Sequence, residues 1–581
     1  MGMEGSRVRM MVRNMVILGC YSLAIPSSQA YVQPRPLPLR AFTPTSFLSH
    51  AVGQRRATVP NAQSPSVTSQ VDLSADISRS AVEVLSVYAQ SPSVKSQVGL
   101  SADTSRSAVE DLSVPDVLRR VDEMMATQKG VEHGVEDMSA SAQALSQWYR
   151  DAGAETILKQ SHFGEMRGMM ATTNIKAGQE ILSYPRAVTM DMSSLTDCPC
   201  TNFVDGNYWK SCLWFVQLGL WLLSEETKGS DSAWAPYIAS LPQSLSRPMD
   251  WTDGQLEMLQ YQPIVKDIKQ QRREFRQIVT ATRSQLVNND QDIDRLEWAM
   301  HIALSRTFHS CGGYGDSAPQ LKDQAKEGPV WRSNKVLIPT QDLINHNSHA
   351  NPKYSYDSST ERFVLSSDTD YTAGQQVYNN YGQVSNDILL QCYGFVELDN
   401  PADTFCLHHL LTWLQGKAYT HQRCSDTAVR LSRLQSLDLI THLNDAHLTM
   451  ATVDCVARET KQALRAFLAS DRDLADIAQL RAEVASDAPI NAQDFSEPLN
   501  PENEMAVFEI LLELVMDTQH AMAGSLQEDT EMLTGTGEEG RGMSEEERTA
   551  VLFRREKRKV IAHARDRLEY NTEMKWLDFS P

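Results

Sequence analysis

Residues 335–396 constrain the fold of this chain most, because two polar turns there follow short apolar strands. Residues 336–338 are an apolar run that Pro339 closes, as expected of a buried strand whose next residue lacks a backbone donor. The polar segment 342–347 follows, and residues 380–382 form the second turn. We expect the two turns, each at the end of a strand, to meet at one site.

The segments between and after these turns indicate short strands. We predict strands at 362–365 and 376–378, separated by a turn at Ala373 and Gly374. A helix is predicted at 386–393, directly after the second turn. The stretch as a whole therefore predicts a β-rich unit in which strands and polar turns alternate.

The motifs DLINHN at 342–347 and AGQQVYNNYGQVSNDILLQCYGFV at 373–396 resemble the SET domain. Their order, their spacing and the YG…SN…YGF continuation are similar to the plastid Rubisco large-subunit lysine methyltransferase subfamily. The resemblance implies an α+β fold, with a β-rich SET domain, an inserted helical subdomain and an all-α C-terminal domain. It also implies S-adenosyl-L-methionine as cofactor and a protein lysine as methyl acceptor. The chain departs from the family at Met166, where a glycine is usual, and at Asn380, where an aliphatic or aromatic residue is usual.

Composition and the resemblance together divide the chain into four regions. A duplication at 63–87 and 90–114 consists of two Ser-rich copies, which are too few and too polar to bury a core. We interpret this part as disordered. The expected regions are a targeting leader at 1–62, a disordered duplicated linker at 63–137, the SET domain at 138–400 with its helical insert at about 195–330, and an all-helical substrate-binding domain at 401–581.

The N-terminal residues resemble the bipartite plastid-targeting leader of algae with secondary plastids. Three arginines precede an apolar run at 15–25, which is short for a membrane span. A small-x-small cleavage site at 28–30 is followed by a stretch with four arginines and no acid at 31–71, which is typical of transit peptides. We expect a location in the plastid stroma and no stable membrane anchor. The alternatives are an ordinary secretory leader with a disordered linker, and a cytoplasmic protein.

The net charge of −20 gives the chain no drive to release counterions from DNA or RNA, so we expect no nucleic-acid partner. Among nine cysteines, Cys198 and Cys200 form the only close pair in the sequence, and no second pair completes a zinc site. We therefore expect no metal, and we interpret the cysteines as free thiols in a reducing compartment. Many SET enzymes that act on histones carry zinc-binding Cys clusters, so their absence from the sequence points away from that branch.

Residues 165–182 predict a strand, a turn and a second strand, and they resemble the opening of the SET domain. By that resemblance Glu165, Arg167 and Gly168 line the cofactor. Without the downstream motifs the same segment would be interpreted as a plain β-hairpin.

A buried helix is predicted at 212–225, because the segment is apolar nearly all round. Residues 233–256 and 295–308 resemble the helical insert of the subfamily, with Arg306 reaching toward the cofactor carboxylate. An arginine at the end of an amphipathic helix is equally ordinary as a solvent-facing residue. The glycine-rich residues 312–315 lack the Lys-Ser/Thr of a phosphate-binding loop and are interpreted as a plain loop.

The resemblance assigns roles to both polar turns. Tyr381 supplies the hydroxyl closest to the reaction, and Tyr393 forms a second wall of the site. Asn345 and His346 bind the amino and adenine ends of the cofactor, and Asp342 fixes the turn. Either Tyr354 or Tyr356 lines the channel for the lysine, and the sequence does not choose between them.

Helix-spaced apolar residues predict helices in the C-terminal region at 404–414, 426–437, 453–468, 473–484, 503–522 and 545–570. The acidic segment 524–544 is predicted to be a loop, and the basic cluster 554–559 to be a solvated helix face. The pattern of the last two helices resembles the substrate-binding domain of the subfamily. It implies a lysine-bearing protein partner, such as the Rubisco large subunit or aldolase, and we expect a monomer.

Two other functions fit the same motifs. A SET fold can serve as a non-catalytic protein-binding module, although keeping Asn345, His346 and Tyr381 together argues for an enzyme. A SET enzyme can also methylate histidine, although Tyr393 in its YGF motif is more similar to the lysine enzymes.

Overall fold

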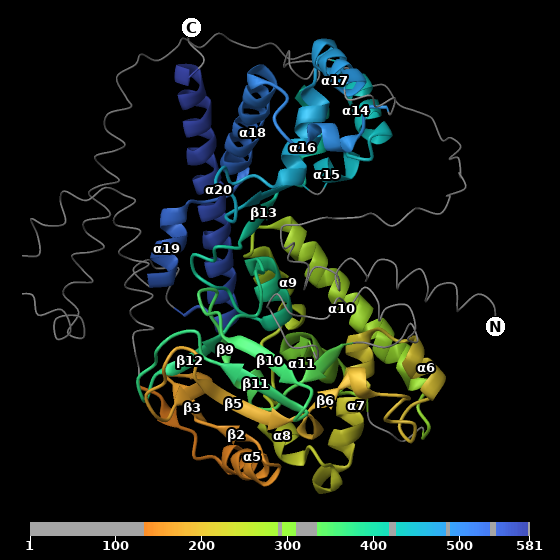
Figure 1. The fold of residues 1–581 in the computed structure, drawn as a ribbon, viewed down its shortest axis with the longest axis vertical. Helices are drawn as coiled ribbons and strands as arrows, with labels where there is room; N and C mark the ends of the chain where they lie inside the picture. Colours follow the sequence, from red (N-terminus) through yellow and green to blue (C-terminus); the bar gives the residue numbers. More distant parts are fainter. Residues whose placement is uncertain are drawn as a thin grey trace, which may run out of the picture. The chain divides into compact units, whose positions relative to one another are not determined.

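The computed structural model describes residues 133–288, 293–309, 334–417, 426–444, 446–483, 489–534 and 542–578 (Figure 1). The predicted leader, nearly all of the duplicated linker and the glycine-rich residues 312–315 lie outside this part of the chain. The last residues of the predicted linker, 133–137, belong to the described part of the chain. Among them, Val135–Glu136 forms strand β1, which pairs with β3.

Three sheets make up the β-rich part. The first has five strands in the order β1-β3-β4-β12-β9, with β3 at Leu158–Phe163, β4 at Met166–Ala171, β12 at Gln376–Asn379 and β9 at Asn345–His346. The second has four strands in the order β10-β11-β5-β2, at Lys353–Asp357, Arg362–Ser366, Glu180–Pro185 and Glu155–Thr156. The third has three strands in the order β6-β8-β7, at Met190–Asp191, Lys335–Leu337 and Thr307–His309. The predicted strands at 336–338, 362–365 and 376–378 are all present.

Most strand pairs are antiparallel, and the pair β12–β9 is parallel. Tyr378 lies opposite Asn345 and Asn379 lies opposite His346. The backbone N–H of Asn347 then donates to the carbonyl of Asn379 at 2.9 Å. This pairing places the two polar turns next to each other.

The helix predicted at 386–393 is α12, Asn386–Ile388, continued by a π-helical turn at Leu389–Tyr393. Gly394 ends it with φ +81°, a left-handed conformation that glycine adopts without strain. A Cβ at Gly394 would also lie 2.4 Å from the carbonyl oxygen of Ser246, so the backbones here meet too closely for any side chain.

Helices of the insert pack beside the sheets. The predicted buried helix is α7, Trp214–Thr227, and its residues from Phe215 to Glu225 are all buried. It packs against α11, Leu296–Arg306, which ends at the predicted cofactor residue. The remaining helices of this part are α5 at Ala140–Asp151, α6 at Gly206–Ser211, α8 at Ala235–Ser240, α9 at Asp253–Glu257 and α10 at Gln262–Arg283.

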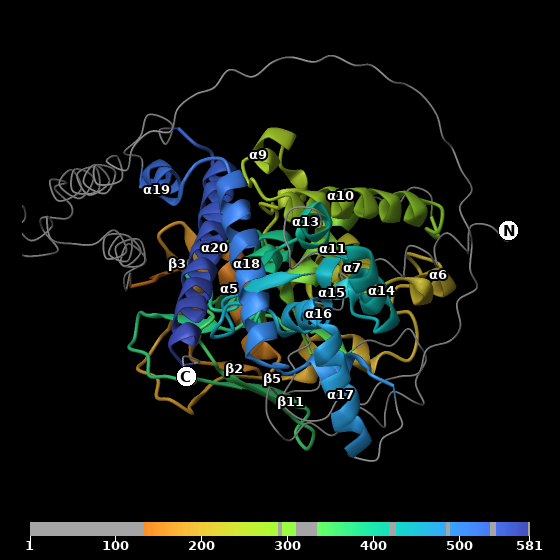
Figure 2. The same ribbon diagram turned by 90° about the horizontal axis from the view of Figure 1, so that it is seen from above.

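The C-terminal region is helical, with one two-stranded sheet. The long helices α18, Pro501–Ala521, and α20, Glu545–Asp578, lie side by side in both views (Figures 1 and 2). The other helices are α13 at Leu410–Lys417, α14 at Thr427–Ser436, α15 at Ile440–Asn444, α16 at Arg458–Leu468, α17 at Asp471–Glu483 and α19 at Leu526–Thr534.

Three predictions for this region are wrong in part. The segment 404–414 begins as strand β13, Thr404–Cys406, because it pairs with β14, His447–Thr449, and buries Phe405 between polar neighbours. Helix α16 starts five residues later than predicted, at Arg458, after a turn in which Cys455 has φ +57°. The predicted loop 524–544 contains α19, whose Leu533 is buried.

The basic cluster at 554–559 was predicted to be a solvated face, and this is wrong. Lys557 is fully buried, and its Nζ donates to Asp403 at 2.8 Å, to the carbonyl of Thr404 at 2.7 Å and to Asp387. Burial favours the neutral amine, but the two carboxylates outweigh it and raise the pKa of Lys557. The ring of Phe553 adds a cation–π contact at 5.0 Å.

Two arginines of the same cluster meet a second buried acid. Nε of Arg554 and Nε of Arg558 donate to the carboxylate of Asp529 at 2.7 and 2.8 Å. Asp529 belongs to α19, the helix absent from the prediction. The charge of the cluster alone predicted that its side chains face solvent. Acids from other segments provide the partners that allow these cations to be buried.

No helix among the described residues has both the length and the apolarity needed to cross a membrane. Within the same ranges, no cluster of three His, Cys, Asp or Glu side chains is arranged to hold a metal ion. Cys198 and Cys200 are buried with their sulfur atoms 3.8 Å apart.

We predict that Lys557→Met lowers the free energy of unfolding by about 3–5 kcal/mol, because it leaves the buried Asp403 and the half-buried Asp387 without their cation. Urea denaturation followed by tryptophan fluorescence measures this. Lys176→Met is the control, since it removes an exposed ion pair with Asp370. An unchanged urea midpoint for Lys557→Met, matching that of the control, would show that the buried pair contributes nothing.

Candidate functional site

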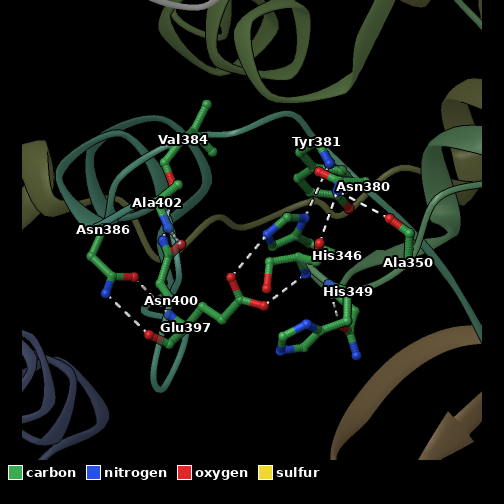
Figure 3. A network of polar contacts seen from close by, with 12 residues as sticks. His346, His349, Ala350, Asn380, Tyr381, Val384, Asn386, Glu397, Asn400 and Ala402 are labelled. Carbon is green, nitrogen blue, oxygen red and sulfur yellow. Dashed lines mark hydrogen bonds and ion pairs between the residues drawn. The ribbon is translucent and has the colours of Figure 1, made fainter. Parts of the chain in front are cut away.

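The parallel pairing of β9 and β12 brings His346 against Tyr381. The backbone N–H of Tyr381 donates to Nδ1 of His346 at 3.0 Å, and the two rings have centroids 5.0 Å apart (Figure 3). These residues come from the two polar turns that the sequence predicted to meet. The structure therefore unites the turns in one site.

A carboxylate that the sequence did not single out holds the other side of the His346 ring. Nε2 of His346 lies 3.2 Å from Oε2 of Glu397, whose Oε1 accepts from the backbone N–H of Ser348 at 2.8 Å (Figure 3). Burial opposes ionisation of Glu397, but these hydrogen bonds outweigh it and lower the pKa of the carboxyl. Because Nδ1 accepts a hydrogen bond, the hydrogen-bond network assigns the ring proton to Nε2.

Tyr381 stands in a cluster of aromatic rings. The ring of Tyr393 stacks on it at 4.9 Å, and the ring of Phe395 meets it edge-on at 6.5 Å. The Tyr381 hydroxyl donates to the carbonyl of Ile344 at 3.0 Å. Burial raises the pKa of Tyr381 to about 12, so the phenol keeps its proton at neutral pH. The arrangement offers aromatic walls and a fixed hydroxyl rather than a base.

Asn345 connects β9 to the opening strands. Its amide nitrogen donates to the carbonyl of Arg167 at 2.8 Å and to Oε1 of Gln376 at 2.7 Å. A Cβ at Gly168 would lie 2.5 Å from that Gln376 oxygen and 2.9 Å from the Asn345 amide nitrogen. Gly168 therefore leaves room beside β4 for the hydrogen-bonded side chains of Gln376 from β12 and Asn345 from β9. Glu165 is exposed in the turn before β4, and among the described residues it shares no hydrogen bond with this group.

Arg306 and Asp342 form the charged part of the site. Nη1 of Arg306 donates to the carbonyl of Asp342 at 2.8 Å and lies 3.3 Å from its Oδ2, to which the hydroxyl of Tyr237 donates at 2.9 Å. Burial raises the pKa of Asp342, and Arg306 opposes that shift. Arg306 and Asp342 also act on the pKa of Tyr381, which places all three in one electrostatic neighbourhood.

Arg167 lies in the same neighbourhood and points its guanidinium at the insert. Its Nη1 donates to the carbonyl of Ser240 at 2.8 Å. Burial, and then the charge of Arg306, lower the pKa of Arg167. The two arginines therefore lie close enough to repel each other, which favours an anionic group beside them.

The two departures from the family motif have local explanations. Met166 is 43% exposed at the start of β4, so the methionine side chain is accommodated without burial. Asn380 ties the second turn in place, because its amide nitrogen donates to the carbonyls of Ser348 and Ala350, both at 3.0 Å. Its oxygen accepts from the backbone N–H of Gly382 at 2.8 Å.

Tyr354 and Tyr356 both pack on Phe363 of β11, with ring centroids 5.7 and 4.7 Å from it. Tyr354 also contacts Phe308, just after the helix that carries Arg306. Sequence reasoning missed Glu397, Gln376 and Tyr237. Glu397 follows the YGFV motif directly, but no pattern in the chain links it to His346.

Comparisons with known proteins agree with this geometry. A family model described as SET domain matches residues 166–382, and one described as Rubisco LSMT substrate-binding matches residues 431–561. N-lysine methyltransferase setd6 of Xenopus tropicalis is 26% identical over 237 residues, which cover 40% of this chain and 50% of that protein. The chloroplastic ribulose-1,5 bisphosphate carboxylase/oxygenase large subunit N-methyltransferase of Pisum sativum is 24% identical over 290 residues, covering 46% and 54%.

The chain spans about half the length of these curated relatives. Among solved structures, Rubisco LSMT bound to AdoMet superposes with a TM-score of 0.51 at 17% identity, covering 75% of this chain and 93% of that one. At this identity the likeness is one of fold, and it confirms the expected α+β architecture with a helical C-terminal region.

We predict that Gly168→Ala destabilises the protein by about 1–3 kcal/mol, because the new methyl group overlaps the Asn345–Gln376 hydrogen bond. Gly416→Ala in α13 is the matched control, since a Cβ there meets nothing within 4 Å. It should be neutral or stabilise the helix by up to about 1 kcal/mol. Thermal unfolding of both variants measures the difference. Equal stability of the two would mean that the space beside Gly168 tolerates a side chain.

Proposed function

Because this chain belongs to the SET-domain proteins that carry a Rubisco LSMT substrate-binding domain, we propose that it is an S-adenosyl-L-methionine-dependent protein-lysine N-methyltransferase. The observation that supports this best is the contact between His346 and Tyr381, which joins the two motifs of the SET resemblance. Two curated relatives named as lysine or Rubisco large subunit N-methyltransferases support the same class of reaction.

The residues present fit S-adenosyl-L-methionine. The Arg306 side chain is 19% exposed, and its contacts with Asp342 are made by Nη1. The rest of the guanidinium can therefore meet a ligand carboxylate. Gly168 keeps the backbone beside Asn345 free of side-chain atoms. We propose that Arg306 binds the carboxylate of the cofactor, that Asn345 and His346 bind its amino and adenine ends, and that Glu165, Arg167 and Gly168 line it. Both ring nitrogens of His346 are engaged within the protein, so His346 acts through its ring face and backbone.

When bound, the cofactor supplies a methyl group on a sulfonium, and the lysine nitrogen forms its bond to that carbon as the sulfur–carbon bond breaks. The amine must first lose a proton to solvent. For a lysine of pKa about 10.4 at a pH of about 8, this costs roughly 3 kcal/mol, at about 1.36 kcal/mol per pH unit. Desolvation between the aromatic walls lowers this cost, because it favours the neutral amine.

The tyrosines then position the neutral amine. Tyr381 keeps its proton, so its hydroxyl can orient the nitrogen without removing a proton from it. Tyr393 and Phe395 exclude water around that hydroxyl. Alignment of the nitrogen with the transferred carbon supplies several kcal/mol of the barrier reduction, so the site requires no strong general base.

The proposed acceptor is a lysine of a folded plastid protein, with the Rubisco large subunit or aldolase as the substrates that the resemblance implies. The helical region after the SET domain supports this, because its family model is described as substrate-binding. A chloroplastic relative and the leader-like N-terminus support a plastid location.

Mass spectrometry of stromal proteins, with and without this chain, tests the proposal. We expect methyl-lysine at one or more sites to disappear when the chain is absent. Loss of methyl-histidine instead would identify the histidine-methylating alternative. No change in either, together with no S-adenosyl-L-methionine binding in calorimetry, would leave the non-catalytic binding module.

We predict that Tyr381→Phe lowers turnover by about 10²-fold while S-adenosyl-L-methionine binding is kept, because the variant loses only the hydroxyl that orients the amine. Turnover on a verified substrate and calorimetric affinity are the measurements. Tyr208→Phe is the control, since it removes a hydroxyl that bonds Thr282 in the insert. Full activity of Tyr381→Phe would remove this hydroxyl from the mechanism.

A further inference from the structure

Both backbone polar groups of Glu397, its N–H and its carbonyl, are hydrogen-bonded to one side chain. Its backbone N–H donates to Oδ1 of Asn386 at 2.9 Å, and its carbonyl accepts from Nδ2 of Asn386 at 3.0 Å (Figure 3). Asn386 is fully buried, and its Nδ2 also donates to Asp403 at 2.8 Å. Because the backbone is clamped in this way, the Glu397 carboxylate has little freedom except to face His346 and Ser348.

We propose that Glu397 is a positioning residue for methyl transfer, which fixes the tautomer of His346 and thereby the placement of Tyr381. The inference rests on the proposed function of this site. The carboxylate accepts a hydrogen bond from the Nε2–H of His346, so Nδ1 keeps a lone pair that accepts a hydrogen bond from the backbone N–H of Tyr381. With the proton on Nδ1, two N–H groups would face each other and the second turn would move.

The hydrogen bonds around Glu397 require a side chain with two acceptor oxygens. Its two oxygens accept from two different donors, His346 Nε2 and the backbone N–H of Ser348. A glutamine of the same shape has one oxygen, so one of the two donors would meet an NH₂ group. Glu397→Gln therefore changes the hydrogen bonding with little change in packing.

The contacts of Glu397 continue to the C-terminal helix. Asn386 shares the Asp403 carboxylate with Lys557 of α20, at 2.8 Å in each case. A continuous set of hydrogen bonds thus runs from α20 through Asp403, Asn386 and Glu397 to His346. The region that resembles a substrate-binding domain thereby supports the turn that carries Tyr381.

The experiment compares the full-length chain with Glu397→Gln, His346→Asn and the double variant. Imidazole ¹⁵N shifts, with His346 assigned by its loss in His346→Asn, report which ring nitrogen carries the proton. Methyl transfer from tritiated S-adenosyl-L-methionine to Rubisco holoenzyme or to aldolase, whichever the wild type methylates, gives kcat and KM. Asp399→Asn is the matched control, because it removes a carboxylate from the same loop that bonds Lys559 instead.

We expect the wild-type proton on Nε2, and a changed ring pattern in Glu397→Gln with a drop in kcat of about 10- to 100-fold and little change in KM for S-adenosyl-L-methionine. If Glu397 acts through His346, the double variant should be no worse than His346→Asn alone. Asp399→Asn should resemble the wild type in both readouts.

Three results would overturn the inference: a wild-type proton on Nδ1, an unchanged ring pattern and kcat in Glu397→Gln, or additive losses in the double variant. If the wild type methylates neither protein, the substrate proposal fails, and the ring patterns of the wild type and Glu397→Gln still decide the role of Glu397. If Glu397→Gln does not fold, the wild-type pattern decides alone, with Nε2 supporting the inference and Nδ1 overturning it.

Discussion

The parallel pairing of β9 with β12 is the constraint on which the rest of the site depends. It involves only two residue pairs, yet a shift by one residue would reverse the direction of every side chain on β9. Asn345 would then lose Gln376, and His346 would lose Tyr381. Side-chain contacts secure this short pairing, because Asn380 bonds the loop after β9 and Gly168 leaves room for the hydrogen bond between Asn345 and Gln376.

Buried charges hold the C-terminal helix against the same region. Removing ions from water costs several kcal/mol for each ion even after relaxation, so a buried pair is stabilising only when its geometry and its remaining hydrogen bonds are good. Lys557 meets that condition with two carboxylates, a carbonyl and an aromatic ring. Its partner Asp403 also bonds Asn386, which clamps Glu397. The cost of burying these charges is thus offset at the point where α20 meets the loop behind the site.

Much of the fold was predictable because it follows from local pattern. The run 336–338, the mostly apolar α7 and the periodic α18 each carry their own signal. The cluster 554–559 did not, since nothing within that helix shows that Asp529, Asp387 and Asp403 would meet its cations. Strand β13 was likewise unpredictable, because its pairing partner β14 lies in a distant segment.

The same division applies to the site. The resemblance of the motifs to the SET domain implied that the turns carrying Asn345, His346 and Tyr381 would meet, because the order and spacing of these motifs can be read from the sequence. Glu397 was missed because its partner is 51 residues away and a lone acid after an apolar motif usually faces solvent. What sequence order cannot supply is the pairing of donors and acceptors across the fold.

The burial that shapes this site also limits its chemistry. A phenol with a pKa of about 12 cannot accept the lysine proton at neutral pH, and both nitrogens of His346 are already engaged. In the proposed reaction the proton therefore leaves before the amine is aligned, and the protein contributes by placing atoms rather than by moving protons. Catalysis of that kind is sensitive to small displacements, because a misplacement of about 1 Å can cost about 10²-fold in rate. If Glu397 positions His346 as proposed, this sensitivity extends to the hydrogen bonds of Asn386 and Lys557 behind it.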